Sequence, residues 1–349
     1  MAIKASGTSL SFSEIRTEFG SNLGSTGVSL GRYRADSIHF TNKVVGSLGS
    51  VGNYLPLDEG VPRSGEIKVS DFYTKKLNII VDFHSGSTTT RVSASNQYAA
   101  NNVAVVGGYT TRPSSPAGKR VIVNVNKKIG SEIGGNDRCA FRTGGSHWNG
   151  SSLELEIGSS GEIYGAGGDG GDGGNGGNGN GSDGQAGSSA IGVETSTLSK
   201  INNLGRIQAG YGGGGGGGGK SERRKVNKKS SRRHSSTGGG GGAGAGYPNG
   251  VGGIPGTGQQ NEGTVGNAGG NGGDQTSGAR GAGGTEAGYG GAGGVVNNSS
   301  TKGEDGQTTG GSGGTAGNNG YAIMTSQGSL PTITGNAVIG RTITSSNPQ

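Results

Sequence analysis

The chain has 349 residues, of which 84 are glycine and only 27% are hydrophobic, and its formal net charge is +7. Such a composition is typical of low-complexity or disordered proteins. The sequence has no run of about 20 apolar residues that could cross a membrane as a helix, and its amino terminus lacks the apolar core of a secretory signal peptide. The single cysteine, Cys139, excludes an internal disulfide and is expected to be a small, partly buried residue.

Residues 1–76 have an ordinary composition and contain two short helical patterns. Ser11 and Glu14 have the spacing of a capping box, which predicts a helix over 12–19 that ends at a glycine. A related pattern returns in IKVSDFYTKK, at 67–76. Neither element is long enough to bury much apolar surface by itself, so we expect both to dock on something else.

Residues 77–160 are the one region whose side chains could form a conventional core. The stretches LNIIVDF, NVAVV, KRVIVNVNKKI and SLELEI are rich in β-branched residues, and turn clusters separate them. Two of the stretches alternate between apolar and polar residues, which predicts one buried and one solvated face. The region is therefore expected to be a β-sheet or β-sandwich domain.

Residues 161–326 are dominated by glycine, with a clear period of three. GGDGGDGGNGGN, at 167–178, consists of Gly-Gly-X units. A polyproline-II helix has three residues per turn and a rise of about 3.1 Å per residue, so X falls on one edge and bare glycine on the other two. Bare edges allow neighbouring helices to hydrogen-bond through their backbones. We predict a packed bundle of polyglycine-II helices, with the all-glycine runs 212–219 and 238–242 inside it; a flexible linker is the alternative.

The segments between the glycine runs are then turns at the two ends of the bundle. The apolar segment 188–208 is expected to cap one end against the β-domain. The polar segments 220–237, 255–263 and 296–307 are expected at the distal end, where a rigid scaffold that carries polar loops is typical of a recognition surface. Residues 327–349 are expected to be a C-terminal tail.

The segment 220–237 carries a dense positive charge with a single acidic residue, Glu222. Such a segment is either a solvated turn or a binding surface. Like charges at this density repel one another, and arginine is suited to the recognition of phosphates and carboxylates. We therefore predict that the segment binds an anionic surface. The candidate binding residues are Lys220, Arg223, Arg224, Lys225, Lys228, Lys229, Arg232, Arg233 and His234.

No catalytic set, metal site or cofactor site is predicted, so the chain is not expected to be an enzyme. The stretch 214–221 matches the phosphate-binding P-loop pattern, but no strand precedes it and no amphipathic helix follows it. The stretch 269–277 partly fits a calcium-binding nonapeptide repeat but lacks its apolar residue. The four histidines have no metal-ligand spacing; they are His39, His84, His147 and His234.

The glycine-rich half resembles a known family. SSLELEIGSSGEIYGAGGDGGDGGNGGNGNGSDGQAG (151–187), GRIQAGYGGGGGGGG (205–219) and the closing GYAIMTS (320–326) are similar to the glycine-rich adhesins at the tips of long tail fibres in T-even-like phages. The resemblance covers about residues 120–345. It implies a sandwich of polyglycine-II helices whose distal loops bind an outer-membrane protein or lipopolysaccharide of the host. It also implies a virion protein made in the host cytoplasm without a signal peptide.

The first part of the chain resembles a different group. SLSFSEIRTEFGSN, VSLGRYR (28–34) and IKVSDFY (67–73) are similar to a short segment of tail-associated proteins in marine phages. This resemblance implies attachment to another tail or fibre protein through the N-terminal segment, and a homotrimer is left open. The candidate attachment residues are Phe12, Ile15, Phe19, Phe72 and Tyr73.

A competing interpretation is a disordered, glycine-rich protein that binds nucleic acid through salt-dependent phosphate contacts. Against it, the positive charge lies in one segment, tyrosine is rarely interleaved with the basic residues, and no RGG box repeats. A secreted structural protein would have longer and more uniform repeats. The main interpretation therefore includes no nucleic acid partner.

Overall fold

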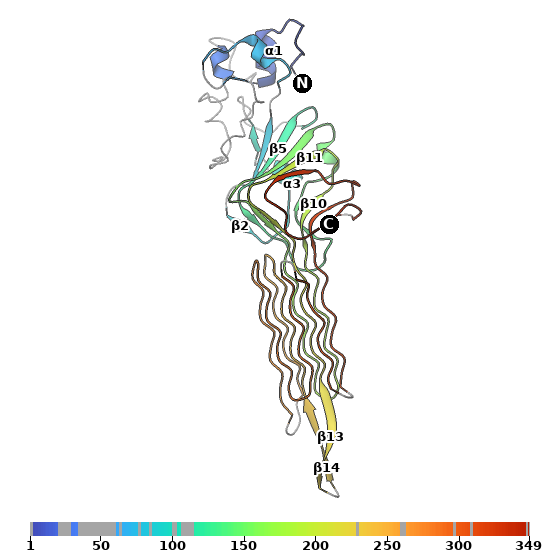
Figure 1. The fold of residues 1–349 in the computed structure, drawn as a ribbon. Helices are drawn as coiled ribbons and strands as arrows, with labels where there is room; N and C mark the ends of the chain where they lie inside the picture. Colours follow the sequence, from blue (N-terminus) through green and yellow to red (C-terminus); the bar gives the residue numbers. More distant parts are fainter. Residues whose placement is uncertain are drawn as a thin grey trace.

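The structure is a computed structural model. It describes residues 3–19, 29–33, 61–62, 65–75, 78–83, 86–99, 103–105, 115–227, 230–258, 263–295, 298–307, 310–346 and 348. The molecule is elongated, with short helices at one end, β-strands next, a long glycine-rich bundle, and a two-stranded hairpin at the far end (Figure 1). None of the helices in these ranges is long and apolar enough to cross a membrane.

The N-terminal unit contains the predicted helix, α1 (Phe12–Phe19), and two 3-10 helices, η2 (Leu30–Tyr33) and η3 (Val69–Phe72). The capping box is confirmed: the Ser11 N–H donates to the Glu14 carboxylate at 2.8 Å, and the Glu14 N–H donates to Ser11 Oγ at 3.2 Å. The hydrogen bond from Lys4, followed by those from Ser11, lowers the pKa of Glu14 to about 2. The charged carboxylate therefore helps to begin α1.

These short elements pack against one another. Ile15, Tyr33 and Phe72 are fully buried, and the Tyr33 ring meets the rings of Phe12 and Phe72 edge-on at centroid distances of 5.9 and 6.2 Å. Each of these elements therefore docks on other parts of the N-terminal unit. Two short helices that are too small to fold alone share one aromatic cluster.

Three sheets form the β-domain. The first has the order β16 (Thr332–Gly335), β11 (Leu198–Asn203), β8 (Ser152–Ile157), β5 (Arg120–Val125), β1 (Ile79–Phe83) and β4 (Val103–Val105). The second has the order β17 (Arg341–Ile343), β15 (Tyr321–Thr325), β10 (Ser189–Val193), β7 (Cys139–Arg142) and β3 (Val92–Ser93). The third has the order β12 (Arg206–Gln208), β9 (Glu162–Tyr164), β6 (Lys128–Ile129) and β2 (Ser87–Thr88). A helix, α3 (Ala94–Ala99), and a 3-10 helix, η4 (Ser146–Trp148), lie between strands.

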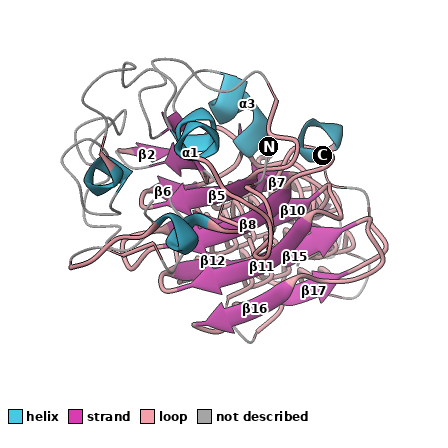
Figure 2. Cartoon of the chain, turned by 90° about the horizontal axis from the view of Figure 1, so that it is seen from above, coloured by secondary structure: helices cyan, strands magenta, loops and turns pink. Residues whose placement is uncertain are grey.

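The chain visits the three sheets in the same order again and again. The groups β1–β2–β3, β5–β6–β7, β8–β9–β10 and β11–β12–β15 are successive turns, and all their neighbouring strands are parallel. A last turn runs through β16, a parallel bridge at Ile339, and β17. Among the β-domain strands that the structure describes, β4 alone pairs antiparallel, at the edge next to β1. The β-domain is thus a three-sided parallel solenoid, and its strands lie side by side from β2 and β6 to β16 and β17 (Figure 2). The expected mostly-β class is confirmed.

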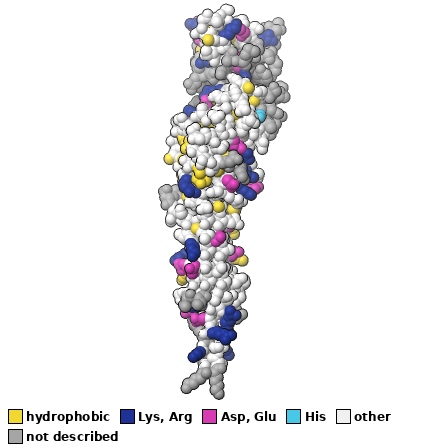
Figure 3. All heavy atoms as spheres, turned by 90° about the vertical axis from the view of Figure 1, so that its right-hand side faces the viewer, with side chains coloured by type: hydrophobic (Ala, Val, Ile, Leu, Met, Phe, Trp, Pro, Cys, Tyr) yellow, Lys and Arg dark blue, Asp and Glu magenta, His cyan; other side chains and the backbone are white. Residues whose placement is uncertain are grey.

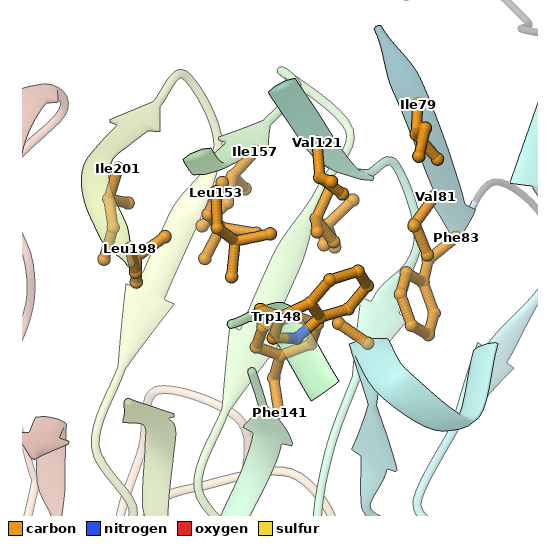
Figure 4. Close-up of a cluster of buried hydrophobic side chains, with 14 of the residues drawn as sticks. Ile79, Val81, Phe83, Val121, Phe141, Trp148, Leu153, Ile157, Leu198 and Ile201 are labelled. Atoms are coloured by element: carbon orange, nitrogen blue, oxygen red, sulfur yellow. The ribbon is translucent and has the colours of Figure 1, made fainter. Parts of the chain in front are cut away.

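The solenoid core contains a row of apolar residues that are in register on neighbouring strands. Along the first sheet this row consists of Val81, Val123, Leu155, Ile201 and Ile333. All of them except Ile333, at the exposed last turn, are buried in one apolar cluster together with Phe141 and Trp148 (Figure 4). The Trp148 indole N–H donates to the Thr143 carbonyl at 2.6 Å, so this corner has a packing role.

The glycine-rich bundle is inserted twice at the same corner of the solenoid. It leaves after β9 and returns at β10, then leaves after β12 and returns at β15. The solenoid therefore extends beyond the expected range of 77–160, because it includes 189–208 and 321–325. Residues 327–349, expected to be a tail, contain β16 and β17 and form the last turn. These strands are short, and they gain their hydrogen bonds and burial only on the preceding turn.

The bundle has the geometry of polyglycine-II helices. Along the run 212–219, successive N–H groups donate in rotation to three different segments, at 179–185, 239–242 and 301–304. Its carbonyl groups accept from three further segments, at 171–174, 288–294 and 311–317. One run therefore touches six neighbours and repeats every three residues, as a helix with three residues per turn requires. The predicted bundle is confirmed, and both all-glycine runs are buried inside it.

Glycine is required inside the bundle because the helices meet backbone to backbone. A Cβ placed on Gly216 would lie 1.8 Å from the Asp172 carbonyl oxygen. At the surface, side chains complete the hydrogen bonding. The side-chain oxygens of Asp169, Asp172 and Asn175 accept the N–H groups of the neighbouring helix at 2.7 to 2.9 Å. The X positions at Asp169, Asp172 and Asn175 thus cap the hydrogen bonding at the edge of the bundle.

One cluster fixes the bundle to the solenoid. Lys128 on β6 forms an ion pair with Asp274, a residue in a turn of the bundle, and its Nζ lies 4.1 Å from the centre of the Tyr247 ring. Gln208 on β12 donates to the Asp274 carbonyl at 2.6 Å. Because this turn is held from two strands, the direction in which the bundle projects is set by the solenoid.

Candidate functional site

The segment expected to be a basic loop is a β-hairpin at the distal end. It consists of β13 (Lys220–Asn227) and β14 (Ser230–Ser236), and it continues beyond the last turns of the bundle (Figure 1). Basic side chains gather near this end of the molecule (Figure 3). The hairpin pairs antiparallel, from Lys220 opposite Ser236 to Asn227 opposite Ser230.

The hairpin register sets like charges against each other. Arg223 stands opposite Arg233, and both side chains are exposed. Directly opposite residues share a face of the hairpin, and like charges in this arrangement destabilise it. The Arg233 Nε donates to Ser221 Oγ at 2.8 Å, which holds one guanidinium in place. The pairing therefore does not serve the stability of the hairpin, and it presents two positive groups side by side.

The foot of the hairpin is ionic and enclosed. Lys220 is buried, and its Nζ lies 3.0 Å from Glu286 and 3.5 Å from Glu222. With His234 and the neighbouring turns these residues enclose a cavity of about 20 Å³, which is room for one water molecule. Glu286 has a φ of 59°, in the left-handed region. This arrangement anchors the hairpin on the bundle.

The neighbours of the hairpin foot come from other distal turns of the bundle. They include 263–264 and 284–286, whose backbone groups bond to Thr237. The segment 296–307, expected to be a distal loop, is different. Its turn at Val295 and Asn298 lies near the solenoid, and its continuation is a helix of the bundle that accepts bonds from Gly215 and Gly218. Part of the expected loop 255–263 lies outside the described residues.

A family model described as phage tail fibre adhesin Gp38 matches residues 87–348 of the chain. The chain belongs to this adhesin family. The crystal structure of the gp37–gp38 adhesin tip complex of the bacteriophage S16 long tail fiber is similar, with 18% sequence identity and a TM-score of 0.40, over 81% of this chain and 89% of that chain. No curated protein sequence matches.

The family match begins within the solenoid of the adhesin, at residue 87, so the N-terminal unit lies outside it. The match covers the bundle, the hairpin and all of the solenoid except β1.

The structure places the adhesin's candidate binding residues in different environments. Arg223, Lys225, Arg232 and Arg233 are exposed on the hairpin. Lys220 is buried in the hairpin foot, so its expected place on the binding surface is corrected: it positions the hairpin. His234 is half-buried opposite Glu222, and Arg224 lies opposite Arg232 in the register. Lys228 and Lys229 lie outside the described residues.

The candidate attachment residues are also corrected. Ile15 and Phe72 are fully buried in the N-terminal cluster and cannot form a contact surface. Phe12 is half-buried against Tyr33, and the Tyr73 hydroxyl donates to a backbone carbonyl of its own unit at 2.6 Å. Phe19 is the last residue of α1. Ile15, Tyr33 and Phe72 thus form the interior of the N-terminal unit, and the side chain of Phe19 lies outside what the structure describes.

Two further kinds of reactive group in the adhesin are metal-ligating side chains and the thiol of Cys139. Among the described residues, no group of three or more histidine, cysteine, aspartate or glutamate side chains is placed to hold a metal ion. Cys139 is fully buried on β7, and burial raises the pKa of its thiol to about 12. The thiol is therefore protonated at neutral pH, as expected for a structural cysteine.

Proposed function

We propose that this phage tail fibre adhesin binds a host receptor through its distal hairpin, and that it acts by binding and not as an enzyme. The receptor is an anionic group of the cell surface, in lipopolysaccharide or in acidic loops of an outer-membrane protein. The observation that carries the proposal is the exposed cross-strand pair of Arg223 and Arg233 at the free end of the molecule.

The energetics of this pair favour a ligand. In the free hairpin, two guanidinium groups on one face repel each other. A phosphate or carboxylate between them replaces repulsion by attraction and accepts charge-assisted hydrogen bonds from both. The hairpin is held by Lys220 at its foot and stands on a hydrogen-bonded bundle, so less conformational freedom is lost on binding than for a flexible loop.

The opposite end of the molecule suits attachment. The N-terminal unit lies at the far end from the hairpin (Figure 1). We propose that it joins the adhesin to another tail or fibre protein of the virion, with a homotrimer as one possible arrangement. The disordered nucleic-acid-binding alternative loses its basis, since the glycine-rich region is a regularly hydrogen-bonded bundle.

Exchange of the hairpin tests the proposal. Residues 221–236 are replaced by a short Ser/Gly turn, and adsorption to host bacteria is measured together with thermal unfolding. The bundle should keep its melting temperature and adsorption should fall at least tenfold. In the parent, adsorption should also weaken with salt, because the Debye length falls from about 10 Å at 0.1 M to about 3 Å at 1 M.

Point variants separate general attraction from specific recognition. Arg223→Ala with Arg233→Ala should lose adsorption, while the control Arg280→Ala, at an exposed arginine on the side of the bundle, should not. Replacement of both arginines by lysine should reduce adsorption only slightly if the contact is general attraction, and strongly if it is bidentate recognition. Unchanged adsorption of the Ser/Gly variant at all salt concentrations would contradict the proposal and leave the hairpin as a solvated turn.

A further inference from the structure

A second cleft lies at the other end of the bundle, where the bundle meets the solenoid. It is formed by the turn at Ser299 and Ser300, by the segment 316–319 that leads into β15, and by Arg341 on β17. Its volume is about 250 Å³. Ligand sites often occur where two structural units meet, so this cleft is a candidate binding site.

Arg341 supplies the only charge among the residues that line this cleft, all of which the structure describes. One Nη donates to the Asn319 carbonyl at 2.9 Å, and the guanidinium carbon lies 4.8 Å from the centre of the Tyr321 ring. These two contacts hold the guanidinium in place. Its other N–H groups remain available for a ligand, and no carboxylate in the lining competes for them.

The other lining groups are almost all polar. Ser300 Oγ donates to the Gly317 carbonyl at 2.8 Å, which fixes its hydroxyl beside the cleft. Asn319 Oδ1 accepts the Gly212 N–H at 3.0 Å, so its amide group still has two N–H donors. The Asn318 amide and the Ser299 hydroxyl are exposed. The cleft therefore combines one fixed cation with hydroxyl and amide groups, and its lining is more polar than apolar.

We propose that this cleft binds an acidic sugar residue. A guanidinium pairs with a carboxylate through two parallel hydrogen bonds. Hydroxyl and amide side chains match the hydroxyl groups of a sugar ring. The cleft, at about 250 Å³, has room for one monosaccharide unit. An apolar ligand would leave the polar lining unpaired, at a cost.

The site is separate from the hairpin and does not depend on the proposed role of that hairpin. Because it lies at the other end of the bundle, the two sites could contact a surface glycan and a receptor group at once, and each contact would raise the effective concentration of the other. Acidic sugars reach a phage from two sources, the ulosonic acid of lipopolysaccharide cores and the uronic acids of capsules. Both share the carboxylate and hydroxyl chemistry that the cleft fits.

Saturation-transfer NMR on the full chain tests this site. D-glucuronate and 3-deoxy-D-manno-octulosonate are compared with D-glucose and acetate. At least one acidic sugar should bind at least tenfold more tightly than glucose and acetate, and the tighter of the two identifies the source. Equal affinities of glucose and the acidic sugars, or equal affinities of acetate and the acidic sugars, would overturn the proposal.

Variants locate the binding. Arg341→Gln should reduce affinity for the acidic sugar at least tenfold, and Arg341→Lys should recover only part of it. Asn318→Ala leaves Arg341 and its contacts in place, so it weakens binding without a risk to the fold. The control is Arg280→Ala, at an exposed arginine on the side of the bundle, which should bind the sugar as the parent does. Unchanged binding by both Arg341→Gln and Asn318→Ala would show that the sugar binds elsewhere.

Discussion

Substitution of Gly216 by alanine should open the bundle around one layer of hydrogen bonds. The added Cβ would lie 1.8 Å from the Asp172 carbonyl oxygen, whereas ordinary contacts begin at 3.4 Å, so the segment that holds Asp172 must move by about 1.6 Å. Two bonds tie that segment to the central run, from Gly171 to Gly214 at 2.8 Å and from Gly174 to Gly217 at 2.7 Å. Such a movement breaks both.

The expected loss of unfolding free energy follows from those two hydrogen bonds. A buried backbone group left without a partner costs about 1–3 kcal/mol, so two bonds correspond to about 2–6 kcal/mol of unfolding free energy. For a region of this size, each kcal/mol lowers the melting temperature by about 2–4 °C. We therefore expect Gly216→Ala to melt at least about 5 °C below the parent in thermal unfolding followed by circular dichroism.

A matched control adds one heavy atom at an exposed position of the same bundle. Ala268 lies on the bundle surface, so Ala268→Ser should melt within about 1 °C of the parent, because a solvated surface change usually stays within about 0.5 kcal/mol. Equal melting temperatures for Gly216→Ala and Ala268→Ser would refute the close backbone packing of the polyglycine-II helices.

Lys220→Met removes the buried cation of the hairpin foot and should lower the unfolding free energy by about 1–3 kcal/mol in denaturant titration, whereas Glu286→Gln keeps an acceptor and should cost less. Asn178→Val loses the amide oxygen that accepts an N–H of β13 and puts a β-branched residue at a φ of 68°, so it should lower the melting temperature; a value equal to that of the parent would contradict this role. Hydrogen bonds from backbone N–H groups lower the pKa of Asp183 and Asp305, so their contribution is present above the ordinary carboxyl pKa and is lost as the pH falls through the folded value. The parent should therefore melt at a lower temperature at pH 3 than at pH 7, and the double variant Asp183→Asn with Asp305→Asn should show a smaller difference; equal differences would be evidence against these caps.

The local features of this adhesin follow from the sequence alone because they depend on neighbouring residues. The capping box at Ser11 and Glu14 and the helix that it begins were predicted with their bounds. The Gly-Gly-X period indicates a helix with three residues per turn, and the all-glycine runs indicate which helices are buried. The concentration of charge in 220–237 likewise marks the hairpin segment, although not its strands.

The solenoid is a feature of the tertiary structure. Ile201 and Ile207, like Ile333 and Ile339, are six residues apart, but in the preceding turn the residues in register with Ile201 and Ile207 are Leu155 and Ile163, eight apart. The bundle interrupts these turns, so the repeat is hidden from a scan along the chain. Each strand is too short to be stable alone and acquires its partners only when the preceding turn is in place.

The roles of single residues at the two ends were also decided by tertiary contacts. In the sequence Lys220 resembles its exposed neighbours, but in the structure it is buried and paired with Glu286 from a distant turn. Ile15 and Phe72 look like a docking surface, but Tyr33 completes an internal cluster around them. Period and composition are local properties that a sequence displays directly, whereas the burial of a given side chain depends on which distant segments fold against it.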